Sequence, residues 1–353
     1  MTIKSAPRFF VTPSLKITGG NLEIIRLARE LAAREDQVAL VAMWSAPHEA
    51  DTHDLRVIHL SQTFISPLAV VAQLPMVVWR FHRLLKRGLR AAVFSHYVTF
   101  ALAWMVSRQQ RWFFVQDTEW LFVSGTRMQA LLKQFILAAL RRGKVISANR
   151  YLTGQMKRYG IHVAVEAAIW ADPGFLGTPK RQREIDLAVV LRRGAHKRAD
   201  LTLSVIEAVK ARSPAAQIVV ISPDSTYRGS IPQSATYVER PILAGMRSLY
   251  ENSRVFALMS QHEGFGLPPL EAMGSGCVPV CRDAGGVTSY MTGELKANIL
   301  PLEMGAEEIA GFIVDLLDDQ SRLDRLSAVS RAIFIQGQHT TSERPSALLE
   351  AGL

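Results

Sequence analysis

Cysteine, long apolar runs and clustered histidines are all scarce in this chain of 353 residues. Cys277 and Cys281 are the two cysteines, four positions apart on an expected strand, which puts them about 13 Å apart on one face and beyond disulfide reach. The nine histidines lack the spacing of metal ligands, so we expect no structural metal. No continuous apolar run reaches the roughly 20 residues that cross a bilayer, and the first residues lack the apolar core of a signal peptide. We therefore expect a cytoplasmic protein.

Acidic residues are scarce in one half of the chain. Residues 1–167 hold 22 lysines and arginines against 10 aspartates and glutamates, whereas the remainder holds 19 against 21. A cluster of basic residues recurs at helical spacing, which predicts a helix with a basic side: Arg80, Arg83, Lys86, Arg87 and Arg90. Such a helix suits an anionic membrane surface or a pyrophosphate-linked lipid, and the protein would then be peripheral on the inner face of the plasma membrane. A solvated basic face is the alternative.

The most informative stretch runs from residue 255 to residue 280. Apolar runs at 255–259 and 277–280 predict two buried strands, and the segment between them is long enough only for a loop and a short helix. Gly264 and Gly266 free the loop backbone for close approach to a ligand, and Pro268 and Pro269 suit the first turn of a helix. The N-terminus of that helix would favour a phosphate.

Two glutamates flank this expected phosphate site. Glu263 stands just before it and Glu271 lies in the helix behind it. Since a carboxylate accepts hydrogen bonds from vicinal hydroxyls, the pair predicts a pocket for sugar hydroxyls around a diphosphate. The alternative is a solvated loop residue and a partner of the helix dipole.

These residues, with Gly-Phe-Gly-Leu-Pro-Pro-Leu between the glutamates and Ala-Met-Gly-Ser-Gly-Cys-Val-Pro-Val after them, resemble the E-x7-E signature of retaining GT-B glycosyltransferases, family 4 in particular. The resemblance implies that Glu263 holds donor-sugar hydroxyls and Glu271 ribose hydroxyls. It places backbone amides near the phosphates, and it implies a metal-independent reaction without a cofactor, the nucleotide sugar being a substrate. The residues expected to supply those amides are Gly264, Phe265, Gly266 and Leu267.

Basic residues follow the first expected strand of the second half, at 185–191. Arg192 and Lys197 are similar to the Arg and Lys pair that the family directs at the donor diphosphate, and Arg193 competes for the role of the Arg. Cations in a loop at the carboxyl edge of a parallel sheet are well placed to stabilise a departing diphosphate. A basic turn exposed to water is the alternative.

The first half alternates expected strands and helices, which argues for a parallel sheet covered on both faces. Gly19 and Gly20 precede a helix that we expect Asn21 to cap, at the position of the family's Gly-Gly loop.

Gln116 and Asp117 follow another strand, where many family members have His-Asp. The Gln-Asp-x-Glu run resembles rhamnan-synthesis-type rhamnosyltransferases, and that resemblance implies dTDP-rhamnose as the donor; helix capping is the alternative.

We expect α/β architecture of the GT-B type, with two Rossmann-like doubly wound domains facing across a cleft. The predicted domains are 1–167 for the acceptor and 168–335 for the nucleotide sugar, with the domain linker placed in residues 161–179. We expect the tail at 336–353 either to be loosely ordered or to cross back to the first domain. The implied reaction moves a sugar to a glycan or lipid-linked acceptor in bacterial surface polysaccharide synthesis.

Two alternatives stay open: an epimerase or phosphorylase on this scaffold, and a basic nucleic-acid-binding protein, although no nucleic-acid module is present.

Overall fold

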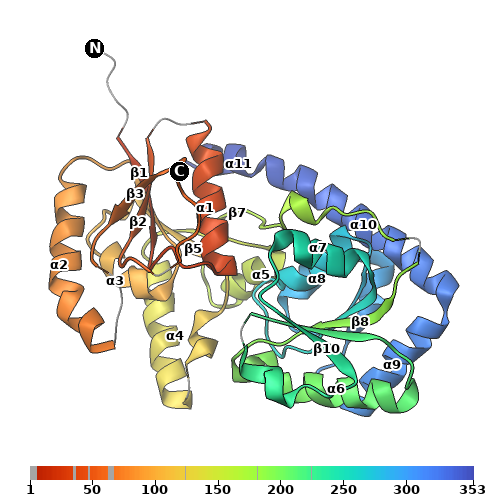
Figure 1. Ribbon diagram of the computed structural model, residues 1–353. Coiled ribbons are helices and arrows are strands. Elements are labelled where there is room, and N and C mark those ends of the chain that lie inside the picture. The colour runs from red at the N-terminus through yellow and green to blue at the C-terminus, as the bar shows by residue number, and fades with distance from the viewer. Residues whose placement is uncertain are drawn as a thin grey trace. The chain divides into compact units, whose positions relative to one another are not determined.

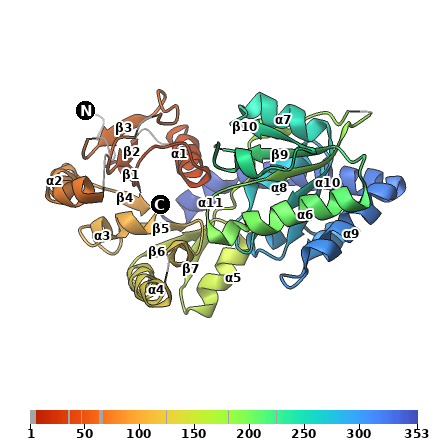
Figure 2. The same cartoon turned by 60° about the horizontal axis from the view of Figure 1, so that its bottom comes forward.

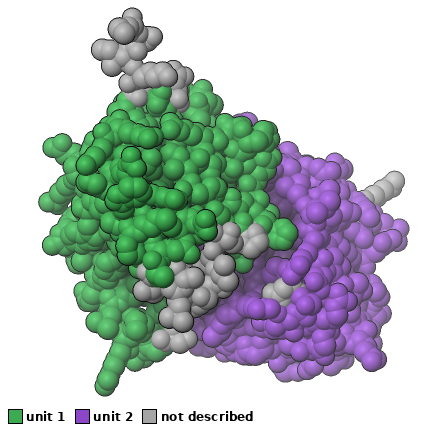
Figure 3. Space-filling view, turned by 60° about the vertical axis from the view of Figure 1, so that its left-hand side comes forward, with its two compact units in different colours: residues 1–169, 342–353 green, residues 170–341 purple. Residues whose placement is uncertain are grey.

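The computed structural model describes residues 6–34, 37–46, 48–62, 67–123, 125–180, 182–223 and 225–353. The chain forms two compact units, residues 1–169 with 342–353 and residues 170–341 (Figure 3). Each unit is built on one sheet in which all paired strands are parallel, with helices against the sheet (Figure 1). The predicted Rossmann-like α/β fold is therefore confirmed for both units.

The sheet of the first unit has the order β3-β2-β1-β4-β5-β6-β7. Because the chain moves outward from β1 to β3 and then returns to the other side of β1, the topological switch lies between β1 and β4, where open sheets of this kind bind ligands. The strands are β1 (Arg8–Thr12), β2 (Val38–Ala42), β3 (Arg56–His59), β4 (Ala91–Phe94), β5 (Arg111–Val115), β6 (Lys144–Ser147) and β7 (Val163–Glu166).

Two helix layers cover this sheet. Helices α2 (Pro67–Leu85), α3 (Phe100–Ala103) and α4 (Thr126–Leu140) lie on one face, and α1 (Gly19–Ala32) with α11 (Arg344–Glu350) lies on the other (Figure 2). The first layer packs into one apolar cluster that includes Val77 of α2 and Leu137 of α4. Helix α5 (Arg150–Arg158) joins β6 to β7. The N-cap of α1 is Thr18 and not the predicted Asn21. The Thr18 hydroxyl accepts the Asn21 N–H at 3.3 Å, so the helix begins at Gly19.

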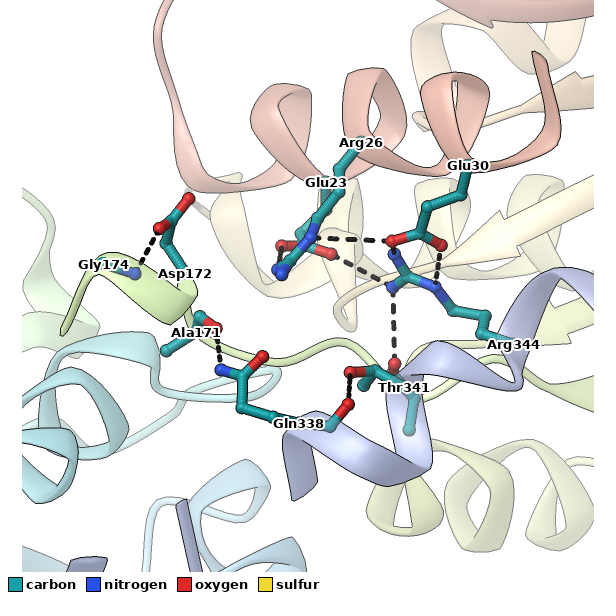
Figure 4. A network of polar contacts seen from close by, with 10 residues as sticks. Glu23, Arg26, Glu30, Ala171, Asp172, Gly174, Gln338, Thr341 and Arg344 are labelled. Carbon is teal, nitrogen blue, oxygen red and sulfur yellow. Dashed lines mark hydrogen bonds and ion pairs between the residues drawn. The ribbon is translucent and has the colours of Figure 1, made fainter. Parts of the chain in front are cut away.

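A buried ion cluster fixes α11 to α1. The Arg344 guanidinium donates to Glu30 at 2.5 and 2.9 Å and to Glu23 at 3.3 Å (Figure 4). Burial raises the pKa of Glu23, although the charges of Arg344 and Arg26 act in the opposite direction. Removing one partner of such a pair would leave an uncompensated buried charge, so the cluster determines where α11 packs.

The sheet of the second unit has the order β10-β9-β8-β11-β12-β13, with its switch between β8 and β11. Its strands are β8 (Ile185–Val190), β9 (Ile218–Ser222), β10 (Ala235–Glu239), β11 (Ser253–Leu258), β12 (Val278–Arg282) and β13 (Ile299–Leu300). Its helices are α6 (Ala199–Arg212), α7 (Leu243–Glu251), α8 (Leu267–Gly274), α9 (Ala306–Asp318) and α10 (Gln320–Ser342). The predicted strand, loop, helix, strand order around residue 265 is confirmed. Both cysteines are buried free thiols.

Several predicted elements are wrong in extent. The boundary between the two units, after Ile169, lies within the predicted linker, but that segment also contains strand β7, whose four residues are too few for the period-two signal to stand out. The basic helix stops at Leu85, and Gly88 adopts a φ of 92° in the turn beyond it, so the later basic residues do not share its face. The last stretch is helical rather than loosely ordered, since α10 reaches Ser342 and α11 follows it, and its residues 342–353 belong to the first compact unit.

Candidate functional site

Two loops meet at the switch point of the second sheet. One follows β8 and carries residues 191–198, and the other follows β11 and carries residues 259–266. Since β8 and β11 are neighbouring parallel strands, both loops leave the same carboxyl edge. The Gln261 N–H donates to the His196 carbonyl at 2.8 Å and fastens the loops together.

An ion pair joins these loops through two predicted site residues. Lys197 Nζ lies 2.9 Å from Glu263 Oε1, and the two side chains are 16% and 8% exposed. Lys197 stands at the end of the short 3-10 helix η4 (Ala195–Lys197), after Gly194 with a φ of 117°. Because water is largely excluded, this pair is much less screened than a surface ion pair.

The backbone of Glu263 is held by the loop after β12. Glu263 N–H donates to the Ala284 carbonyl at 2.8 Å, and its own carbonyl accepts from Gly286 N–H at 2.9 Å. A Cβ added at Gly286 would lie 2.4 Å from the Gly264 carbonyl oxygen. Only glycine fits there, so the Gly285-Gly286 pair holds the loop that presents Glu263.

The loop from Gly264 to Leu267 turns directly into α8. Gly266 has a φ of 82°, and the Tyr290 hydroxyl donates to its carbonyl at 2.5 Å. Phe265 is buried, with its ring centroid 5.2 Å from that of Tyr290. Tyr290 was not among the predicted site residues, because its distance along the sequence gives no sign of this contact.

Glu271 lies in α8 beside the cation of the other loop. Burial raises the pKa of its carboxyl to about 7, and the charge of Arg192 and the hydroxyl of Tyr250 act in the opposite direction. Burial also raises the pKa of Tyr250, strengthened by the charge of Glu271. The charge of Arg192 therefore acts on Glu271 without a direct ion pair between them, and Tyr250 is a neighbour that the sequence did not reveal.

Arg193, the competing candidate, is placed differently from Arg192. Its guanidinium Nε donates to Thr226 Oγ1 at 2.8 Å, and the residue is exposed. Arg192 is half-buried, with its carbonyl accepting from the Tyr227 hydroxyl at 3.2 Å. Of the two arginines, Arg192 is the one that acts on Glu271.

The predicted residues of the first unit also gather at a carboxyl edge. A Cβ added at Gly20 would lie 3.4 Å from Gln116 Oε1, so the start of α1 and the end of β5 are in contact. Gly19 is the first residue of α1, and Asp117 Oδ1 accepts the Thr118 N–H at 2.7 Å. Gly20 and Gln116 are therefore brought together.

Two further residues at this edge, His96 and Glu119, were not among the predicted site residues. Glu119 Oε2 accepts the Tyr97 N–H at 2.6 Å, and Oε1 lies 4.0 Å from His96 Nε2. Burial raises the pKa of Glu119 to about 8 and lowers that of His96 to about 4. Both groups are therefore largely neutral at pH 7.

Among the residues described, no three histidine, cysteine, aspartate or glutamate side chains gather as a metal site requires.

Comparison with known proteins gives two kinds of match. Residues 241–332, which include α8, match the family described as Glycosyl transferases group 1. The GDP-mannose:cellobiosyl-diphosphopolyprenol alpha-mannosyltransferase of Komagataeibacter xylinus is 28% identical over an alignment of 157 residues that covers 40% of this chain and 39% of that enzyme. The chain thus matches less than half the length of this curated relative.

Solved structures match over nearly the whole chain. Sucrose-phosphate synthase from Thermosynechococcus elongatus superposes with a TM-score of 0.78 at 16% identity, over 98% of this chain and 97% of that one. HepE from Anabaena, in complex with UDP-glucose, gives a TM-score of 0.76 at 14% identity, over 98% and 100%. WaaG, a glycosyltransferase involved in lipopolysaccharide biosynthesis, gives 0.68 at 11% identity, over 96% and 97%. The chain therefore has the GT-B fold, and its second unit carries a segment that matches the group 1 glycosyl transferases.

Proposed function

We propose that this protein is a metal-independent, retaining glycosyltransferase. It moves a sugar from a nucleotide diphosphate donor to a hydroxyl of a glycan or lipid-linked acceptor. The observation that carries the proposal is the Lys197–Glu263 pair at 2.9 Å, which brings a cation and a hydroxyl-binding carboxylate together at the switch point of the second sheet.

The donor would lie along the start of α8. Glu271 would accept hydrogen bonds from the ribose hydroxyls and Glu263 from the hydroxyls of the transferred sugar. Backbone amides of 264–267 would approach the phosphates, since the first N–H groups of a helix lack partners within the helix. The αL conformation of Gly266 and the bond from Tyr290 would hold this turn in shape.

The basic groups would act on the leaving diphosphate. Negative charge grows on its oxygen as the glycosidic bond breaks, and a fixed cation in a site with little water stabilises that charge. Lys197 and Arg192 lie on the loop that faces the two glutamates and could take this role. In the proposed reaction the phosphates replace the carboxylates as partners of these cations.

The first unit would bind the acceptor. Gln116 and Gly20 are in contact at its carboxyl edge, and Asp117 stands beside them in the sequence. Amide and carboxyl groups at this edge can exchange hydrogen bonds with the hydroxyls of a glycan. The role in bacterial surface polysaccharide synthesis rests on the sequence resemblance and on relatives such as WaaG.

The donor needs direct identification. The relatives name GDP-mannose and UDP-glucose, whereas the Gln-Asp-x-Glu run favours dTDP-rhamnose. A thermal-shift panel of UDP, dTDP and GDP with their sugars would identify it, because a ligand that binds only the folded state raises Tm. Clear preference for a UDP- or GDP-hexose over dTDP-rhamnose would remove the rhamnosyl proposal.

Turnover tests the rest of the proposal. With the identified donor and an acceptor, we expect release of the nucleoside diphosphate, a product with the anomeric configuration of the donor, and full activity in EDTA. An epimerase would release no diphosphate when acceptor is added, and a phosphorylase would need free phosphate. Either result would contradict the proposal.

A further inference from the structure

The first unit combines a lack of acidic residues with unusual apolar exposure. Between residues 55 and 165 the chain holds 16 lysines and arginines but only two acidic residues, Asp117 and Glu119. Both acidic residues lie in the candidate acceptor site just described. The surface formed by this part of the chain is therefore cationic.

Large apolar side chains are exposed on the same part of the chain. Of the 14 exposed large hydrophobic residues found among the described residues, eight fall between 55 and 165. These eight are Leu74, Val78, Trp79, Trp104, Leu121, Met128, Leu131 and Phe135. A solvated basic face explains the charge but not this apolar exposure.

Helix α4 shows the pattern most clearly. Met128, Leu131 and Phe135 are 56%, 67% and 37% exposed, and their spacing of three and four places them on one outward side. The opposite side packs into the core through Ile136, Leu137 and Leu140. Helix α4 thus has apolar residues on two opposite sides. The inner side is apolar because it packs into the core, whereas packing does not explain the apolar residues on the exposed side.

Helix α2 lies in the same layer as α4 and presents a similar surface. Trp79 is 54% exposed, and the Arg83 guanidinium lies 4.9 Å from its ring centroid. Figures 1 and 2 place both helices on the same face of the first sheet. A tryptophan next to arginines is typical of helices that lie in the interface of an anionic bilayer.

We propose that the outward side of α4, with Trp79 of α2, docks the first unit onto an anionic lipid surface. The apolar side chains would enter the boundary between headgroups and acyl chains, and basic residues of this unit, such as Arg83 beside Trp79, would contact the lipid phosphates. None of the described helices combines the length and hydropathy needed to cross a bilayer, and docking of this kind requires none. This docking would bring the proposed acceptor site to a lipid-linked substrate, and it rests on the proposed function only for that purpose.

The test compares two double variants of the full chain by co-sedimentation with vesicles of phosphatidylcholine, with and without phosphatidylglycerol. M128S/L131S removes two side chains that are 56% and 67% exposed, and the matched control I242S/L243S removes two that are 76% and 44% exposed in the second unit. We expect binding to the anionic vesicles to fall by about tenfold or more in the first variant and by less than about twofold in the control. Raising the salt concentration should weaken binding of the wild type.

Three results would overturn the docking proposal. They are equal vesicle binding by both variants, binding of RNA without binding of vesicles, and a wild-type dimer that M128S/L131S converts to a monomer. Unchanged circular dichroism and an unchanged Tm shift with nucleoside diphosphate would show that M128S/L131S still folds and keeps its donor site. Failure of docking is therefore distinguishable from failure of the proposed function.

Discussion

The carboxyl edges of the two sheets surround their buried acidic residues differently. In the second unit Glu263 lies 2.9 Å from Lys197, and the charge of Arg192 opposes the effect of burial on the pKa of Glu271. In the first unit burial raises the pKa of Glu119 to about 8, and no cation is among the causes of that shift. The comparison teaches that one Rossmann-like frame can hold a buried carboxylate beside a cation at one sheet edge and a buried carboxyl that keeps its proton at the other.

The largest effect should come from the cation of the second edge. We expect Lys197→Ala to lower kcat by about 10²-fold or more, because a cation that meets growing charge on the diphosphate acts mainly in the transition state. Lys210→Ala is the matched control, since Lys210 donates to the Pro214 carbonyl on exposed surface of the same unit. Steady-state kinetics would check both, and near-normal turnover in Lys197→Ala would reject its role.

The two adjacent arginines sharpen the assignment. Arg192→Ala should cost about tenfold or more in kcat/KM, because it removes the charge proposed to contact the donor diphosphate. Arg193→Ala should cost much less, since that side chain is exposed and bonded to Thr226. The reverse order in the same kinetic assay would assign the phosphate contact to Arg193.

The pKa of Glu271 predicts how donor binding depends on pH. Burial raises this pKa to about 7, so the accepting carboxylate form grows as pH rises through 7. Donor affinity should therefore increase between pH 6 and pH 8 in the wild type and vary much less in Glu271→Gln. Calorimetric titrations over that range would check this, and the same pH dependence in both proteins would refute it.

The glycine pair offers a structural test of the second edge. Gly286→Ala would force a Cβ to 2.4 Å from the Gly264 carbonyl oxygen. We expect a loss of about 1–3 kcal/mol in the free energy of unfolding, together with weaker donor binding. Gly229→Ala is the control, because its Cβ would meet nothing within 4 Å. Urea unfolding of both variants measures the difference, and equal stability would contradict the close approach of the loops.

The last prediction concerns the stability contributed by Glu119 in the first unit. The Glu119 carboxyl has a pKa near 4.5 in the unfolded chain and about 8 in the folded protein. Between these values the folded state keeps a proton that the unfolded state releases. The free energy of unfolding therefore falls progressively as pH rises from about 4.5 to about 8. Glu119→Gln should raise Tm relative to the wild type increasingly over that range. A Tm difference that stays constant with pH would show that Glu119 is already ionised.

Much of this arrangement was predictable from the sequence. Continuous apolar runs such as 185–191 predicted buried parallel strands, and the glycines and prolines between Glu263 and Glu271 predicted a loop that enters a helix. The sequence alone did not predict that Lys197 contacts Glu263. That contact depends on β8 and β11 being neighbours in the sheet, which the structure shows. Distance along the chain hides such contacts.

Other features had no local signal. Tyr290 donates to Gly266 from 24 residues away, and Arg344 reaches Glu23 from 321 residues away. The basic segment after residue 80 carried a helical charge pattern, but helix α2 ends at Leu85, and Gly88 has a φ of 92° in the turn that follows. Periodicity predicts which residues share a face only while the helix continues, and it gives no information on where a turn will stop it.

The most direct test of the central claim is calorimetric titration of UDP, dTDP and GDP into the wild type, Lys197→Ala and Glu271→Ala. We predict that at least one nucleotide binds the wild type with one molecule per chain, and that its affinity falls by about tenfold or more in both variants. A nucleotide that binds all three proteins equally well would contradict a donor site at the switch point of the second sheet.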